Sequence, residues 1–166
     1  VRIREVKPEI VKLKVHSQGS VMPSTESQLI PEVSGRITWM SSKLVAGGYF
    51  EKDEILARVD ELDYKNDLNR ARSKLIRAEA EQQHAQFEFQ RLKSLEQRQL
   101  TSRSQMENSL RALRVADATL QDARVNFQQA SQNLERTQIK APFTGLVRSE
   151  QVDIGQFISR GAAIAT

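Results

Sequence analysis

Apolar and small residues recur every three or four positions through the middle of the chain, in two successive series. The first series comprises Leu68, Ala71, Leu75, Ala78, Gln82, Ala85, Phe89 and Leu92. The second comprises Leu110, Leu113, Ala116, Leu120, Ala123, Phe127, Ala130 and Leu134. This spacing is that of the positions that form the seam of a coiled coil. Because no glycine or proline occurs from residue 49 to residue 141, the pattern predicts two uninterrupted helices within 61–138.

The two series match each other as an antiparallel hairpin. When the first position of one series is paired with the last of the other, and so on inward, each pair of residue numbers adds up to 201 or 202. Leucine or phenylalanine then mostly faces leucine or phenylalanine, and alanine faces alanine. This pairing predicts a tip near 100–102 between two helices of about 35 residues, each about 50 Å long at 1.5 Å per residue.

Capping signals stand at the expected helix starts. Asp60 is placed to cap the first helix, and Asp63 supplies an acidic residue to its first turn. Ser102 and Gln105 have the spacing of a capping box for the second helix.

The segments outside the hairpin have the patterns of short β-strands. Val11, Leu13 and Val15 alternate with polar residues, which predicts a strand with one wet face. Further strands are expected at 28–33, 36–39 and 55–59, because these β-type runs are separated by proline or glycine. Trp39 is expected in the β core.

The two flanks of the hairpin resemble each other. Counted from Gly47 and from Gly155, the third and ninth following residues are apolar and the tenth is alanine in both copies. Gly35 precedes Gly47 by twelve positions, whereas Gly145 precedes Gly155 by ten, which indicates a two-residue insertion near 41–44. An internal repeat predicts two quasi-equivalent sheets, one from each half, packed around a shared core. Two unrelated hairpins with similar turn glycines would give a weaker form of the same pattern.

Ile37 and Phe143 are expected in that shared core. The fold class is therefore α+β, with β-domain halves at 28–60 and 139–166 and the helical hairpin at 61–138 between them.

Charge and composition narrow the function classes. The formal net charge of +4 is concentrated near the N-terminus, where five Lys/Arg face two Asp/Glu within residues 1–16. The hairpin has thirteen Lys/Arg and eleven Asp/Glu, too balanced for strong attraction to nucleic-acid phosphates, so no nucleic-acid partner is expected. The chain has no cysteine, and neither His16 nor His84 lies in a catalytic motif. We therefore expect no enzyme, no metal site and no cofactor.

Four segments then carry a family resemblance: 33–37 (VSGRI), 47–60 (GGYFEKDEILARVD), 134–145 (LERTQIKAPFTG) and 155–161 (GQFISRG). With them, the chain resembles the periplasmic adaptor subunits, or membrane fusion proteins, of tripartite efflux pumps of the resistance-nodulation-division type. The run from Arg136 to Gly145 is the most specific of these elements.

The resemblance implies an architecture and partners. The two β halves would form a lipoyl-like β-sandwich, and residues 1–27 would be the first strands of an adjoining β-barrel or membrane-proximal region. The hairpin would point toward a TolC-type outer-membrane channel, and the protein would also contact an inner-membrane transporter. Implied as well are self-association as a hexamer or trimer of dimers, and a periplasmic location with an inner-membrane anchor absent from this chain.

The family also has an arginine, leucine and serine motif that docks on the channel. Its spacing is matched by Arg91, Leu95 and Ser102, which implies a docking tip at the independently inferred turn. Each residue also has a structural explanation: Leu95 would close the seam, Ser102 would serve only as a cap, and Arg91 would be a solvated helix residue.

Three alternatives remain open at this point. Adaptors of ATP-driven exporters or type I secretion systems share the architecture. A carrier domain holding lipoate or biotin would display a modified lysine on the turn that the hairpin replaces, yet no Met-Lys-Met or Asp-Lys-Ala sequence occurs. An RNA-binding coiled-coil arm is disfavoured by the balanced charge of the hairpin.

Overall fold

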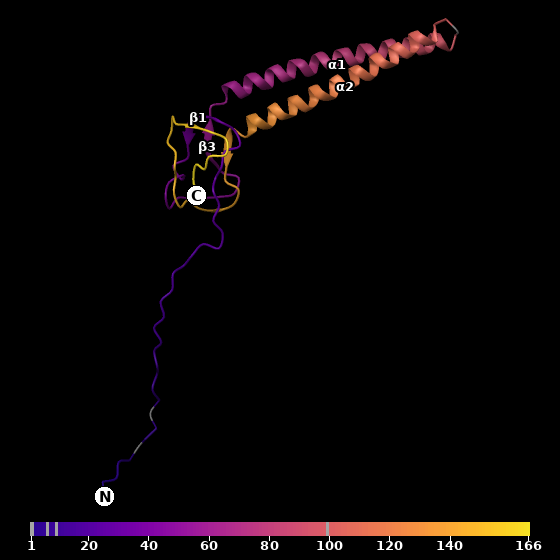
Figure 1. Ribbon diagram of the computed structural model, residues 1–166. Coiled ribbons are helices and arrows are strands. Elements are labelled where there is room, and N and C mark those ends of the chain that lie inside the picture. The colour runs from indigo at the N-terminus through magenta and orange to yellow at the C-terminus, as the bar shows by residue number, and fades with distance from the viewer. Residues whose placement is uncertain (1, 6, 9, 99) are drawn as a thin grey trace.

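Two long helices project from a small β-domain, and the N-terminal segment leaves that domain in a different direction (Figure 1). The computed structural model describes residues 2–5, 7, 8, 10–98 and 100–166. Its elements in chain order are β1 (Gly35–Met40), β2 (Tyr49–Phe50), β3 (Ile55–Val59), α1 (Leu62–Glu96), α2 (Arg103–Glu135), β4 (Gln138–Lys140), β5 (Gly145–Leu146) and β6 (Phe157–Ile158). The expected α+β fold is confirmed.

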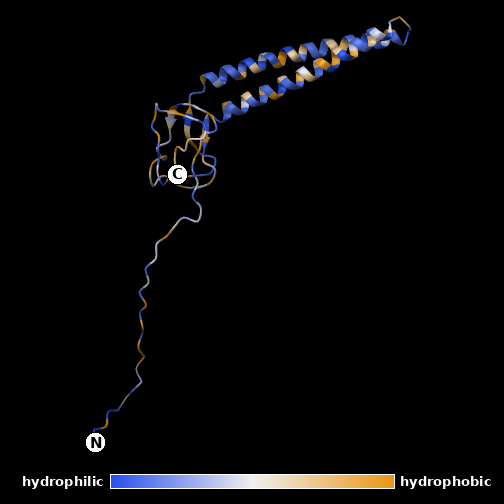
Figure 2. Ribbon diagram, in the orientation of Figure 1, coloured by the Kyte–Doolittle hydropathy of each residue, from blue (hydrophilic) through white to orange (hydrophobic). Residues whose placement is uncertain are grey.

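The helical hairpin consists of α1 and α2 packed along a seam that follows the two predicted series. All sixteen predicted seam positions are buried or half-buried, while much of the ribbon of α1 and α2 has the colour of hydrophilic residues (Figure 2). Ala78, Leu120 and Ala123 form a buried cluster with Leu75 packed against it. Gln82, the polar member of the first series, donates a hydrogen bond from Nε2 to Oδ1 of Asp117 on the opposite helix at 2.9 Å. Its amide is thereby satisfied at the edge of an otherwise apolar seam.

One seam position differs from the prediction. Near the tip Ser109 is 8% exposed, whereas Leu110 is only half-buried. Counting back from Leu113, the alternation of three and four places a seam residue at 109 rather than 110. The Ser109 hydroxyl donates to the carbonyl oxygen of Met106 at 2.8 Å, which satisfies the buried polar group.

The strands of the two halves are exchanged between the two sheets. The larger sheet has the order β4-β3-β1-β6, and the smaller one pairs β2 with β5. Each sheet therefore contains strands from both sides of the hairpin. The expectation that each half forms one sheet is wrong: β1 pairs with β3 of its own half, but β4 and β6 of the second half join them in one sheet, and β2 pairs with β5 of the other half.

The internal repeat itself is confirmed by matching hydrogen bonds. The Gly155 N–H donates to the Ile37 carbonyl at 2.8 Å, and the Gly47 N–H donates to the Val147 carbonyl at the same distance. Gly47 and Gly155 have φ of 85° and 89°, a left-handed conformation that favours glycine. The equivalent residues thus form equivalent turns.

A second set of bonds places the insertion. The Ser41 N–H donates to the Leu56 carbonyl in the first copy, and the Gln151 N–H donates to the Ile164 carbonyl in the second. These equivalent donors are 110 positions apart. The acceptors Val45 and Asp153 in the following turns are 108 positions apart. The two extra residues therefore lie between 41 and 45, where the glycine spacing put them.

The β core is small and almost entirely aliphatic. It consists of Val33, Ile37, Leu44, Phe50, Leu56, Ala57, Val59, Ile139, Ala141, Val147, Val152, Ile158, Ile164 and Ala165. Both halves supply these side chains, so neither half has a core of its own.

Two aromatic residues assigned to the core lie at its edge. Trp39 is 41% exposed and its ring lies 5.2 Å from the Arg58 guanidinium carbon. The pairing of β1 with β3 shifts register between Ile37 and Trp39, and such a bulge turns the next side chain off the face that alternation predicts. Phe143 is 38% exposed; it packs on Phe50 with ring centroids 6.3 Å apart.

Two predicted strands are not formed as such. The 11–15 segment has no strand pairing within the described residues and its side chains are exposed, because alternation alone supplies no neighbouring strand to bond. The 28–33 segment is reduced to a single bridge between Leu29 and Ala165. That bridge is the repeat equivalent of the Ala57–Ile139 pair of β3 and β4.

These positions differ in what truncation should cost. Ile37 is 1% exposed, so Ile37→Ala is expected to lower the free energy of unfolding by about 2–5 kcal/mol, measured by urea denaturation. Phe143→Ala should cost clearly less, because part of that ring is already in water. An equal loss from both variants would contradict this description of the core.

Candidate docking site at the hairpin tip

Both feet of the hairpin are fixed to the β-domain. The Thr137 carbonyl, just after α2, accepts a hydrogen bond from the Val59 N–H of β3 at 2.9 Å. In the first turns of α1, the Tyr64 hydroxyl donates to the Ser34 carbonyl at 2.6 Å. Because both feet are hydrogen-bonded to the same small region of the β-domain, that domain sets the direction in which the hairpin points.

The start of α1 differs slightly from the prediction. The helix is preceded by Glu61, which makes no side-chain capping bond. Asp60, the predicted cap, lies one residue earlier and still accepts a hydrogen bond from the Leu62 N–H at 3.0 Å. Asp63 is in the first turn, as predicted.

The tip is a short turn held by backbone hydrogen bonds on one side and a helix cap on the other. At the end of α1, the N–H groups of Arg98 and Leu100 donate to the Leu95 carbonyl at 3.1 and 2.9 Å. At the start of α2, Ser102 and Gln105 form the predicted capping box. The turn occupies residues 97–102 and contains the predicted 100–102; residue 99 within it lies outside the described part of the chain.

Arg91 lies on the outside of α1, near the tip. Its guanidinium forms an ion pair with Glu88, with Nε donating to Oε2 at 3.0 Å. This hydrogen bond lowers the pKa of the Glu88 carboxyl below its usual value. The exposed guanidinium has more donors than Glu88 occupies, so it keeps the capacity to bind a second acceptor.

The three predicted tip residues lie at the same end of the rod in different surroundings. Arg91 and Leu95 are one helical turn apart on α1 and share a face. Leu95 is half-buried, whereas Ser102 is exposed and begins α2. Each of them also has a local structural role: Leu95 lies at the seam and Ser102 caps α2, while Arg91 is an exposed helix residue whose ion pair with Glu88 was not predicted from the sequence.

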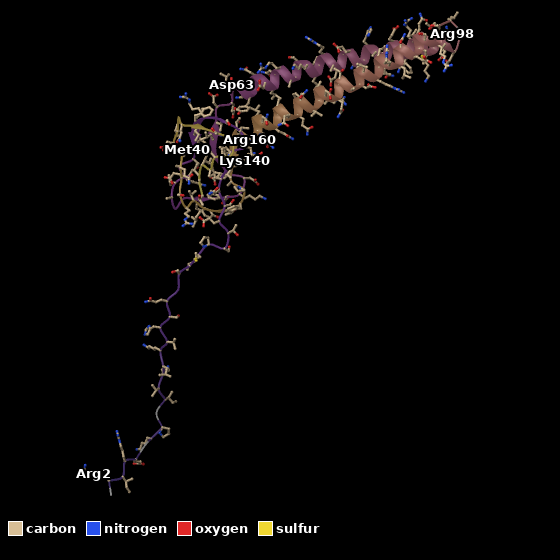
Figure 3. All side chains as sticks on the ribbon, viewed as in Figure 1. Arg2, Met40, Asp63, Arg98, Lys140 and Arg160 are labelled. Carbon is tan, nitrogen blue, oxygen red and sulfur yellow. The ribbon has the colours of Figure 1, made fainter. Side chains whose placement is uncertain are left out.

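Sequence reasoning missed the residues at the apex. Leu100 is 69% exposed within the turn. Arg98 lies at the far end of the hairpin (Figure 3), and Arg103 follows the cap at the first position of α2. Their position in or beside the predicted turn could have identified them. Leu100 in particular lies outside the two seam series, so the packing of the helices does not require a leucine there.

Other parts of the described structure offer less chemistry. Within residues 2–5, 7, 8, 10–98 and 100–166, no group of three or more His, Asp or Glu is arranged to hold a metal ion. A groove of about 810 Å³ runs beside β2 and β5, with Glu26 and Arg148 paired at its rim. In the same residues, neither helix is sufficiently long and apolar to span a membrane.

Comparison with curated proteins gives one consistent group of relatives. No family model matches the chain. The chain is 24% identical over 161 residues to the multidrug resistance protein MdtA of Photorhabdus laumondii, covering 97% of this chain and 40% of that protein. It is 23% identical over 163 residues to the multidrug resistance protein MdtE of Escherichia coli K12, covering 98% and 42% respectively. The chain therefore spans about two-fifths of the length of these relatives.

Solved structures show the same fold. A protein from Bacteroides eggerthii described as an efflux transporter superposes with a TM-score of 0.62 at 24% identity, over 84% of this chain and 38% of that one. MacA from Actinobacillus actinomycetemcomitans gives 0.55 at 23% identity, over 86% and 48%. The periplasmic adaptor protein EmrA gives 0.50 at 16% identity, over 84% and 70%. The resemblance inferred from the sequence motifs is thereby confirmed: the chain is similar in sequence to multidrug resistance proteins, and it shares its fold with MacA and with the periplasmic adaptor protein EmrA.

Proposed function

We propose that the chain is the reaching part of a periplasmic adaptor that links an inner-membrane transporter to a TolC-type outer-membrane channel. The hairpin tip, with Arg91, Leu95 and Ser102, docks on the channel. The β-domain acts as a lipoyl-like platform, and residues 1–27 lead into a β-barrel or membrane-proximal region. The protein works as a hexamer or trimer of dimers, anchored at the inner membrane, and transports no substrate by itself.

The length of the hairpin is the main observation that supports this proposal. Helices of 35 and 33 residues extend about 50 Å at 1.5 Å per residue, far beyond what is needed to cover the β core. The rod is solvated along its sides and both of its feet are fixed, so its tip is held at a distance from the β-domain. A rigid spacer with a defined end suits a protein that connects two partners.

Cross-linking tests the docking directly. The chain has no cysteine, so a single Gln97→Cys substitution places a photoreactive maleimide on an exposed residue of the turn. In cells that make the full-length protein and its channel, this position is expected to cross-link to the channel. The matched His84→Cys position is exposed on the arm, thirteen residues before Gln97, and should not. Equal cross-linking from both positions, or from neither, would contradict tip docking.

The partner transporter is proposed to be of the resistance-nodulation-division type. An adaptor of an ATP-driven exporter or of a type I secretion system would use the same rod and tip. Deleting the gene of the transporter encoded beside this protein tests which class is the partner. Only deletion of the true partner should abolish the resistance that depends on the adaptor.

A carrier function predicts a different covalent state. In this chain the connection from β3 to β4 is the hairpin, so the turn on which a carrier lysine would be displayed is replaced. We expect the intact mass to equal the sequence mass after expression in a host with lipoyl and biotinyl ligases. A mass increment equal to either group would refute the adaptor proposal in favour of a carrier domain.

A further inference from the structure

We propose that the apex of the hairpin, formed by Arg98, Leu100 and Arg103, is the part of the tip that enters the partner. It fits a protein surface with an apolar pocket bordered by carboxylates. This inference rests on the proposed docking function and deepens it, because the apex lies beyond the motif residues Arg91 and Leu95.

Leu100 is the apolar part of the apex. Its side chain is 69% exposed, although its backbone is held by the bond from its N–H to the Leu95 carbonyl at 2.9 Å. The capping box at Ser102 fixes the residues that follow. An exposed leucine on a fixed turn at the end of a rod can enter a pocket with little loss of conformational freedom. Leu95, by contrast, is half-buried against the seam.

Charge is distributed unequally along the rod. Residues 88–114 contain six Lys/Arg and three Asp/Glu, a net of +3. Residues 61–87 together with 115–138 contain seven Lys/Arg and eight Asp/Glu, a net of −1. Arg103 has an internal partner in Glu107 at 3.0 Å, whereas Arg98 forms no ion pair with any described residue. The positive end of the rod therefore complements an acidic surface.

A protein partner suits this apex better than a lipid surface. Residues 97–104 contain a single leucine and no aromatic residue, and binding to a membrane surface needs a larger apolar face along with its cations. One apolar anchor flanked by two arginines is sufficient for a pocket in a protein interface, where arginine is enriched among the residues that dominate binding.

The test measures binding of the full chain to a purified TolC-type channel from the same host, in detergent, at two salt concentrations. Arg98→Glu is expected to weaken binding at least about tenfold and to reduce its salt dependence, since attraction becomes repulsion. Leu100→Ala should weaken it at least about fivefold without changing the salt dependence. Arg72→Glu and Ile76→Ala are matched controls at exposed positions of α1, and they should bind like the unmodified chain. All four variants should have the same melting temperature as the unmodified protein.

The outcomes separate this inference from the function on which it rests. If Arg98→Glu and Leu100→Ala bind normally while Arg91→Asp does not, the apex inference is wrong and tip docking stands. If the unmodified chain does not bind the channel, the docking function fails and the apex inference fails with it. Sedimentation of the chain with phosphatidylglycerol vesicles, lost in Leu100→Ala, would assign the apex to lipid and overturn the protein partner.

Discussion

Ending the chain after Arg98 is expected to abolish the β-domain entirely, rather than to leave half of it folded. The larger sheet would lose β4 and β6, and β2 would lose its only partner strand, β5. The core would lose the seven side chains that the second half contributes, namely Ile139, Ala141, Val147, Val152, Ile158, Ile164 and Ala165. The remaining apolar surface cannot offset the conformational entropy of ordering residues 29–60.

The measurement is the dispersion of amide resonances in an NMR spectrum of the shortened chain. Its control is the complementary change, in which residues 66–132 are replaced by a short turn. That protein keeps all six strands and the bond from Val59 to Thr137, so a folded β-domain is expected. Dispersed resonances for residues 29–60 in the shortened chain would show that a half folds alone, against the exchanged-strand architecture.

Reversing the charge of Arg91 should have the largest functional effect. In a full-length background, Arg91→Asp is expected to collapse efflux-dependent resistance while the protein level and melting temperature persist. The side chain is exposed, and its only ion pair among the described residues is with Glu88 on its own helix, so we expect the fold not to depend on it. At a docked surface, the new carboxylate would repel the group that the guanidinium attracted and leave that group without its partner.

The chain offers a closely matched control for this variant. Arg70 pairs with Asp67 at the same three-residue spacing on the same helix, far from the tip. Arg70→Asp therefore breaks an equivalent ion pair and creates the same local repulsion, but should leave resistance intact. Loss of resistance in both variants would mean that the helix, rather than docking, is affected. Full activity and full channel cross-linking in Arg91→Asp would remove Arg91 from the docking site.

The other two motif residues are less decisive. Ser102→Ala removes the side chain that accepts the Gln105 N–H, and the loss of such a cap costs about 1 kcal/mol. Leu95→Ala opens the half-buried end of the seam. In both variants, a change in docking would be mixed with a change in the stability of the turn.

The helical hairpin was predictable in detail because its interactions repeat at short intervals along the chain. The steps of three and four between Leu68 and Leu92 already define one face of a helix, and the matching series up to Leu134 defines its partner. With two faces of equal length, antiparallel pairing leaves one place for the turn. Ser102 could be assigned as the cap for the same reason, since a capping box needs only two residues three positions apart.

The repeat in the β-domain was also readable, because Gly47 and Gly155 mark equivalent left-handed turns. Which strands pair was not readable, since a strand pattern identifies a wet and a dry face and names no neighbour. The exchange of β4 and β6 into one sheet with β1 and β3 therefore appears only in the three-dimensional structure.

For the same reason Trp39 was misplaced: its side chain turns outward at a bulge that depends on β3. The exposure of Leu100 and Arg98 at one end of the rod likewise follows from how the turn closes, which no periodic pattern describes.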